Sequence, residues 1–299
     1  MERTGKGGVY LGVGPDQNFT YIVSLRPQMA FIVDIRRQNL LLHLLYKALI
    51  ERARDRVAFV SGLFSRPPPP GIGRDADAMK LMTAFTSSPP SDALFEKNLR
   101  DVIARLTEHH HFALTSDDIA QLTSTYTAFF KGGPDIQYTI RAGPSLRFPT
   151  WAELVQETDA DGQAHGYLAS EERFRALREM QERNLIVPIV GDFAGDRALP
   201  AIGRYIEEHG ARLAAFYVSN VEMYLFQDPT GGAWHRFYGH LAALPVDARS
   251  VVIRSFNLGR PAPTGPVRIQ LATVLDPVEE LLHEVDAGRV GTYADVVAR

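Results

Sequence analysis

The chain has 299 residues, of which 45% are hydrophobic and 22% are charged, so it can bury a full core as a soluble globular protein. Its net charge of -3 supplies no overall basic field for a nucleic acid, and the absence of cysteine excludes disulfides, thiolate metal sites and a cysteine nucleophile. Because no long apolar run and no leading apolar segment are present, we expect a cytoplasmic protein without a membrane partner.

Two short apolar runs near the start of the chain resemble the first two strands of a nucleotide-binding fold. The first run ends at Gly12 and Gly14, and the second ends at Asp34. Glycine allows a sharp turn and a close approach of the backbone to a ligand, and an acid at this spacing holds ribose hydroxyls in such folds. The third glycine of the dinucleotide fingerprint is missing, because Asp16 and Gln17 follow Gly14, so a pyrophosphate is poorly accommodated. The alternative is a tight turn that is only rich in glycine.

Helical patterns follow the second apolar run. Leucines at helical spacing predict a helix over residues 40–54, while residues 56–64 fit either a strand or a continued helix. The proline run at 67–70 then breaks the chain. Further helices are expected over residues 76–86, 91–107 and 116–130, and another helix opens at Ser170.

Three adjacent histidines, His109, His110 and His111, follow one of these helices. Side chains that are adjacent on a helix point about 100 degrees apart, so the three cannot all face one metal ion. The end of a helix that favours cationic side chains is the simpler interpretation. We therefore expect no metal site.

Strands and helices alternate in the last third of the chain. Such alternation predicts βαβ units, a mostly parallel sheet with helices on both faces, and ligands at the carboxyl ends of the strands. We expect an α/β core formed by residues 1–65 and 169–299, with a helical insertion or cap over 66–168 between its second and third strands. The expected elements are strands over 185–193, 213–220, 250–256 and 267–274, and helices over 201–209 and 234–241.

These features together resemble the class I S-adenosylmethionine-dependent methyltransferases. The resemblance rests on the glycine loop after the first strand, the acid that closes the second, and the Gly-Asp-Phe that closes the third. It implies a Rossmann-like fold with S-adenosyl-L-methionine as cofactor, the glycine loop facing its methionine part, the first acid its ribose and the second acid its adenine. Carried over position by position, the residues implied in this way are Gly12, Gly14, Asp34, Asp192 and Phe193. Four further residues at the strand ends complete the candidate cofactor-binding set: Asp16, Asn18, Ile35 and Ser219.

The chain departs from the pattern of that family in three places. Tyr10 stands where the family has an acid, and Asp16 stands where it has a third glycine. The connection between the second and third strands is far longer than the single helix of the family. The Asn/Asp-Pro-Pro-aromatic motif of amino methyltransferases is replaced by the segment 219–224, which leaves the methyl acceptor unknown.

Three polar residues after the strand at 213–220 are the candidate catalytic groups: Asn220, Glu222 and Tyr224. Methyl transfer from a sulfonium needs an in-line approach in a pocket poor in water, and a base only where the acceptor must lose a proton. Amide, carboxylate and phenol groups together predict a polar small-molecule acceptor. Glu222 is expected to line its pocket, unless Arg36 or Arg37 pairs with the carboxylate. Asp16 and Asn220 are alternatively caps of the helices that follow them.

Two other functions fit parts of this pattern. A nicotinamide-dependent oxidoreductase also needs a Gly-x-Gly loop and an acid such as Asp34, although the missing third glycine and the Gly-Asp at Asp192 argue against it. A non-catalytic methyltransferase-like binding module is the second alternative. The sequence does not define the oligomeric state.

Overall fold

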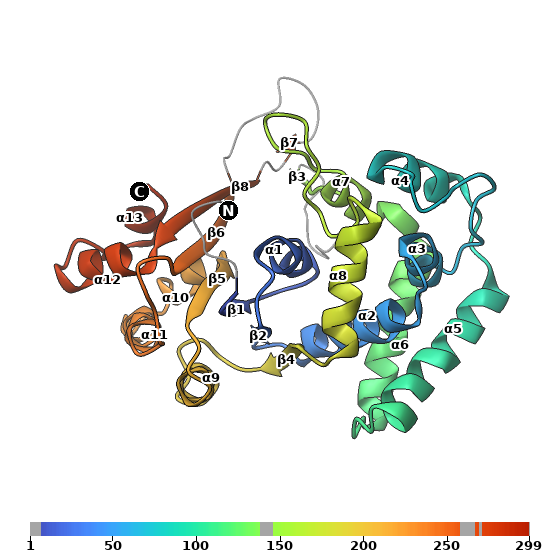
Figure 1. Cartoon of the computed structure of the whole chain (residues 1–299). Coiled ribbons are helices and arrows are strands. Elements are labelled where there is room, and N and C mark those ends of the chain that lie inside the picture. Colours follow the sequence, from blue (N-terminus) through green and yellow to red (C-terminus); the bar gives the residue numbers. More distant parts are fainter. Residues whose placement is uncertain (1–6, 138–145, 258–266, 269–270, 299) are drawn as a thin grey trace. The chain divides into compact units, whose positions relative to one another are not determined.

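The computed structural model describes residues 7–137, 146–257, 267–268 and 271–298, which form two compact units (Figure 1). The sheet unit comprises Met1–Leu40, Leu185–Gly259 and Gln270–Arg299, and the helical unit comprises Leu41–Asn184 and Arg260–Ile269. The borders expected from the sequence, after residues 65 and 168, both fall inside the helical unit. The chain therefore leaves the sheet unit soon after its second strand and returns to it just before the third.

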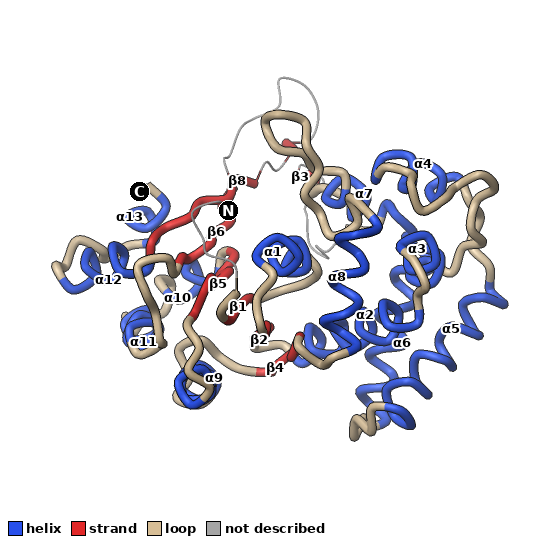
Figure 2. Tube along the Cα trace, in the orientation of Figure 1, coloured by secondary structure: helices blue, strands red, loops and turns tan. Residues whose placement is uncertain are grey.

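The sheet unit is built on one six-stranded sheet, whose strands are red in Figure 2. The strand order is β4-β2-β1-β5-β6-β8, and neighbouring strands are parallel except for β6 and β8. Counted along the chain, this is the 3-2-1-4-5-6 order of the dinucleotide-binding fold with its last strand reversed. The strands are β1 (Val9–Gly12), β2 (Met29–Asp34), β4 (Ile186–Val190), β5 (Leu213–Ser219), β6 (Val251–Asn257) and β8 (Leu271–Pro277).

Helices cover both faces of this sheet, as expected from the sequence (Figure 1). Alternate residues of a strand point to opposite faces. Tyr10 of β1 therefore meets α1, where its hydroxyl donates to Asn18, while Leu11 joins an apolar core with Phe237 of α11 and Leu281 of α12. The helices are α1 (Gln17–Leu25), α9 (Ala198–Glu208), α10 (Val221–Leu225), α11 (Gly232–Ala242), α12 (Val278–Asp286) and α13 (Tyr293–Val297).

The helical unit contains most of the helices expected between the second and third strands of the sheet. Residues 56–64, ambiguous in sequence, are helical because the Asp55 side chain caps the helix at the backbone nitrogen of Ala58, at 2.8 Å. The main helices are α2 (Arg37–Arg52), α3 (Arg56–Phe64), α4 (Ala78–Ser87), α5 (Asp92–Ala104), α6 (Ser116–Gly132), α7 (Trp151–Val155) and α8 (Glu171–Glu182). A π-turn (Arg105–His109), a 3-10 turn (Gly133–Asp135) and two short paired strands, β3 (Leu146–Arg147) and β7 (Val267–Arg268), complete it.

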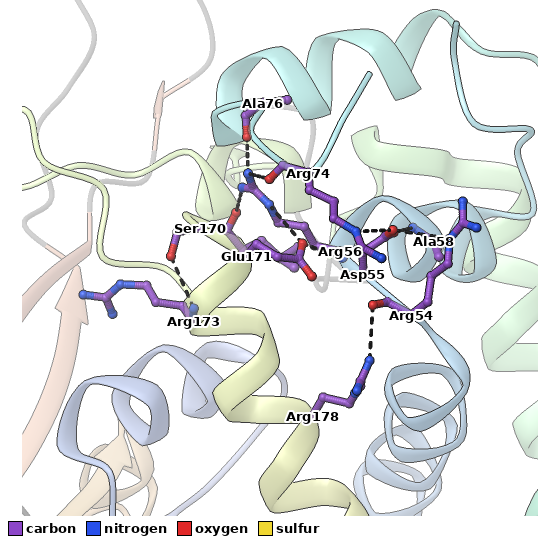
Figure 3. Close-up of polar contacts among 11 residues, drawn as sticks. Arg54, Asp55, Arg56, Ala58, Arg74, Ala76, Ser170, Glu171, Arg173 and Arg178 are labelled. Atoms are coloured by element: carbon purple, nitrogen blue, oxygen red, sulfur yellow. Dashed lines mark hydrogen bonds and ion pairs between the residues drawn. The ribbon is translucent and has the colours of Figure 1, made fainter. Parts of the chain in front are cut away.

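A buried arginine fastens the start of α3 to its surroundings within the helical unit (Figure 3). Arg56 donates to the backbone oxygen of Leu168 at 2.7 Å and to that of Arg74 at 2.9 Å, and also to that of Ala76. Its Nε lies 3.8 Å from the Glu171 carboxylate at the start of α8. Burial lowers the pKa of Arg56, and the charge of Glu171 opposes this shift. One side chain thus joins three segments that are distant in sequence.

The last expected strand differs from the observed structure. The prediction of one strand over residues 267–274 was wrong, because two strands occupy this region: β7 pairs with β3 in the helical unit, and β8 pairs antiparallel with β6 in the sheet unit. Alternation of apolar residues reports that a segment is extended, but it does not report which partner the segment pairs with. None of the helices within the described residues is long and apolar enough to cross a membrane.

Candidate functional site

The strand order of the sheet unit reverses between β1 and β5, and this reversal locates the candidate site. In open α/β sheets, ligands bind beyond the carboxyl ends of the strands at such a switch point. The loop that follows β1 begins at this edge, the acid that closes β2 lies one strand away, and the turn after β5 lies on the other side. The residues expected from the sequence to bind a cofactor come from these three segments and from the loop after β4.

The glycine loop is held in shape by Asn18. The Asn18 amide nitrogen donates to the backbone oxygens of Val13, Gly14 and Pro15 at 3.0, 3.1 and 2.6 Å, and its oxygen accepts from the Tyr10 hydroxyl at 2.9 Å. A Cβ at Gly12 would lie 1.9 Å from this oxygen, so the missing side chain at Gly12 makes room for Asn18. Asn18 is fully buried, and we assign it the task of shaping the loop.

Gly14 differs from Gly12 in what surrounds it. It has a φ of +78°, a backbone conformation that glycine adopts without strain, and a Cβ added there would meet no described atom within 4 Å. Gly14 therefore leaves room for a side chain that it does not have, in a buried position just after the carboxyl end of β1.

Asp34 closes β2 and forms an ion pair with Arg36. Its Oδ1 accepts from the Arg36 backbone nitrogen at 2.9 Å and from Nε at 3.2 Å, and its Oδ2 accepts from Nη2 at 3.3 Å. The Asp34 side chain is 5% exposed, whereas that of Arg36 is 68% exposed. The hydrogen bond to Asp34 raises the pKa of Arg36. The sequence had suggested Arg36 as a partner of Glu222, but its partner is Asp34.

Two apolar side chains are exposed beside Asp34. Ile35 is 69% exposed and Val190, which pairs with Asp34 in the sheet register, is 43% exposed. Large apolar side chains that stay exposed next to a carboxylate are suited to a ligand with one apolar face and hydroxyl groups. The two residues come from the ends of adjacent strands, β2 and β4.

Asp192 and Phe193, the two residues expected to bind adenine, have different surroundings in the loop after β4. Asp192 is exposed, and its Oδ1 accepts from the backbone nitrogen of Ala194 at 2.9 Å. Phe193 is buried in the apolar core, with its ring 5.0 Å from that of Phe216 and 5.7 Å from that of Phe237. Phe193 therefore serves the core, which leaves Asp192 as the group of this loop that faces outward.

The turn after β5 has an irregular backbone. Ser219 has a φ of 51°, uncommon for a residue with a Cβ, and the register with β6 shifts between Tyr217 and Ser219. Asn220 begins α10, yet neither its side chain nor that of Asp16 at α1 makes a cap hydrogen bond within the described residues. The capping interpretation of these two residues is therefore wrong. Tyr224 is 59% exposed.

Glu222 does not line a pocket, and this expectation from the sequence is corrected. The side chain is 1% exposed, and both of its oxygens accept from Arg254, with the Oε1 contact at 3.1 Å; Oε1 also accepts from the Tyr238 hydroxyl at 2.6 Å. Arg254 is fully buried and also pairs with Asp276 of β8. Burial and the Glu222 charge raise the pKa of Tyr238, which stays a neutral donor. Glu222 is a structural residue.

One feature of the sequence points to this buried cluster. Arg254 interrupts the apolar run Val251–Ile253 in a strand expected to be buried, and a charge in such a strand must be paired. The three adjacent histidines lie in the helical unit. His110 lies 2.7 Å from the Glu51 carboxylate, and among the described residues no group of three His, Asp or Glu could hold a metal ion.

The fold and the edge just described define an α/β protein of Rossmann-like architecture, with a glycine loop and a carboxylate at its switch point. The chain belongs to the family described as Domain of unknown function (DUF7790), whose model matches residues 3–66 and 79–283. No curated protein matches the sequence. Among solved structures, the chain is similar to "rRNA methyltransferase aviRa from Streptomyces viridochromogenes", with 12% identity over 94% of this chain and 82% of that one. The TM-score of 0.31 is too low for this likeness to bear on function.

Proposed function

We propose that the chain is an S-adenosylmethionine-dependent methyltransferase that acts on a polar small-molecule acceptor. The observation that carries the proposal is the arrangement at one edge of the sheet unit. A carboxylate closes β2, exposed Ile35 and Val190 flank it, and Gly14 lies just after the end of the adjacent strand β1. A nucleoside offers two hydroxyls and a flat apolar base, which match these groups.

The residues of this edge have separate tasks in the proposal. Asp34 accepts hydrogen bonds from the two ribose hydroxyls, Ile35 packs on the base, and Asp192 accepts from a polar group at the rim of the base. Gly14 admits the amino-acid part of the cofactor close to the main chain. When bound, S-adenosyl-L-methionine supplies a methyl group that its sulfonium makes electrophilic.

The acceptor side of the site is assigned to the turn after β5. Asn220 can donate and accept with its amide, and exposed Tyr224 offers a phenol that can orient a polar acceptor. These residues act by holding the acceptor in line with the methyl group, since orientation supplies much of the rate in such a reaction. Glu222 takes no part in proton transfer, because Arg254 and Tyr238 occupy its carboxylate.

Asp34→Ala is expected to weaken the binding of S-adenosyl-L-methionine by about 1.5 to 3 kcal/mol, the contribution of hydrogen bonds to a charged group. The dissociation constant should rise about 10- to 150-fold. Isothermal titration calorimetry on the full chain measures this change. Asp196→Ala, which removes an exposed carboxylate from the loop after β4, is the matched control and should bind like the wild type.

Two results would contradict the proposal in different ways. Unchanged affinity in a folded Asp34→Ala variant would remove Asp34 from the site. Saturable binding of a nicotinamide dinucleotide to the wild type, with no binding of S-adenosyl-L-methionine, would favour the oxidoreductase, whose ribose would use the same carboxylate.

A further inference from the structure

Asp34, the carboxylate that we assign to the ribose, already forms an ion pair with Arg36, two residues further along the chain. The guanidinium of Arg36 meets Asp34 as a fork, with Nε on Oδ1 and Nη2 on Oδ2, at 3.2 and 3.3 Å. Two parallel N–H···O bonds of this kind use both carboxylate oxygens at once. The Arg36 backbone nitrogen makes a third contact, which does not depend on the side chain.

A vicinal diol would use the same two oxygens. Each hydroxyl donates one hydrogen bond, and the spacing of the two hydroxyls suits the two oxygens of one carboxylate. Asp34 is itself buried, so a ligand approaches it from its open side, which is where the exposed Arg36 side chain lies. The guanidinium and a diol therefore compete for one position.

We propose that Arg36 occupies the diol-binding side of Asp34 and must move away before a ribose-bearing ligand can bind there. The inference rests on the ribose site of the proposed function. It adds a conformational step to that site, in which the side chain of the free protein is exchanged for the hydroxyls of the ligand.

The strength of the ion pair sets the size of the effect. An ion pair with an exposed partner is weak, so the fork opens readily, and only the open molecules can bind the diol. In the free protein the apparent dissociation constant equals the intrinsic one divided by the fraction of open molecules, so removing the fork should tighten binding about twofold to fivefold.

Three variants of the full chain test the proposal by calorimetry. Arg36→Ala removes the fork and the charge, Arg36→Lys keeps the charge without the planar fork, and Arg197→Ala removes an exposed positive charge from the loop after β4. The probes are S-adenosyl-L-methionine, nicotinamide adenine dinucleotide, adenosine and 2′,3′-dideoxyadenosine. Adenosine is uncharged, so a change in its affinity does not arise from charge alone.

We expect adenosine and S-adenosyl-L-methionine to bind about twofold to fivefold more tightly to Arg36→Ala, with Arg36→Lys between it and the wild type. Arg197→Ala should bind adenosine like the wild type, and the dideoxy probe should show no gain. Equal or weaker binding of adenosine to Arg36→Ala would overturn the inference, as would an equal gain for the dideoxy probe.

The outcome also separates this inference from the proposed function. If adenosine or the dinucleotide binds with the expected gain while S-adenosyl-L-methionine does not bind, the methyltransferase proposal fails and the role of Arg36 stands. If S-adenosyl-L-methionine binds without a gain in Arg36→Ala, the role of Arg36 fails alone. If none of the diol probes binds to any variant, Asp34 is not a diol site and the inference is overturned.

Discussion

Arg254→Met is expected to lower the free energy of unfolding of the sheet unit by about 3 to 5 kcal/mol, the cost of breaking a buried ion pair. Arg254 pairs with both Glu222 and Asp276, and both carboxylates are buried. Methionine has a similar length but removes the cation that pairs with the buried Glu222 carboxylate.

The two tryptophans of the chain allow each unit to be followed separately. Trp234 lies in α11 with its ring 6.1 Å from that of Tyr238, whereas Trp151 is buried in the helical unit. In a Trp151→Phe background, urea unfolding followed by fluorescence therefore reports on the sheet unit. Arg249→Met removes a cation whose pair with Asp247 is exposed and should cost less than about 1 kcal/mol. An equally small loss in Arg254→Met would contradict the buried cluster.

Glu51→Gln is expected to destabilise the helical unit by a similar amount, about 3 to 5 kcal/mol. The Glu51 carboxylate has no exposure and receives Lys47 at 2.6 Å, Arg105 at 2.9 Å and His110 at 2.7 Å. Glutamine keeps the shape of the side chain but leaves Lys47 and Arg105 without their common anion. Fluorescence of Trp151 in a Trp234→Phe background measures the loss, and Glu179→Gln, from an exposed pair, is the control.

The pH dependence of this difference has a defined sign. Burial alone would raise the pKa of Glu51, but the hydrogen bonds from Lys47, His110 and Arg105 outweigh it and lower the pKa below its usual value of about 4.5. A carboxyl with a lowered pKa stabilises the fold above its unfolded pKa, and this contribution is lost as the pH falls through the folded pKa. The gap between wild type and Glu51→Gln should therefore be constant near neutral pH and shrink below about pH 4.5. A gap that grows on acidification would contradict this assignment.

The elements of the sheet could be predicted because local patterns determine them. Apolar runs bounded by Gly, Pro and Asp place β1, β2, β5 and β6 close to their observed ranges. The alternation of strands and helices after residue 185 predicted a parallel sheet, and the observed strand order agrees with it. Periodicity is a property of neighbouring residues, so it is visible in a single sequence.

The partners of charged residues could not be predicted in the same way. Glu222 and Arg254 are 32 positions apart, and Arg254 and Asp276 are 22 apart, so no local pattern joins them. Arg36 was close enough in sequence to be considered for Glu222, yet it pairs with Asp34, two residues away. The main segment of the helical unit, Leu41–Asn184, begins inside α2 and ends just after α8.

For the site residues too, position in the sheet could be predicted from the sequence, but packing could not. Glycines and the acid at strand ends follow from the topology, which places Gly14 and Asp34 at one edge of the sheet. Whether a side chain at such an edge faces outward depends on packing that the sequence does not state. Phe193 is buried in the core, while Asp192 beside it is exposed. Asn18 is buried and forms hydrogen bonds with the backbone of the glycine loop.

A crystal structure of the full chain with S-adenosylhomocysteine, the product of the cofactor, tests the central claim most directly. The proposal predicts that both ribose hydroxyl oxygens lie within about 2.6 to 3.2 Å of the Asp34 carboxylate. It also predicts that the base lies against Ile35 and that Arg36 no longer contacts both carboxylate oxygens. A nucleoside bound at another edge of the sheet unit, or one whose ribose does not meet Asp34, would contradict the claim.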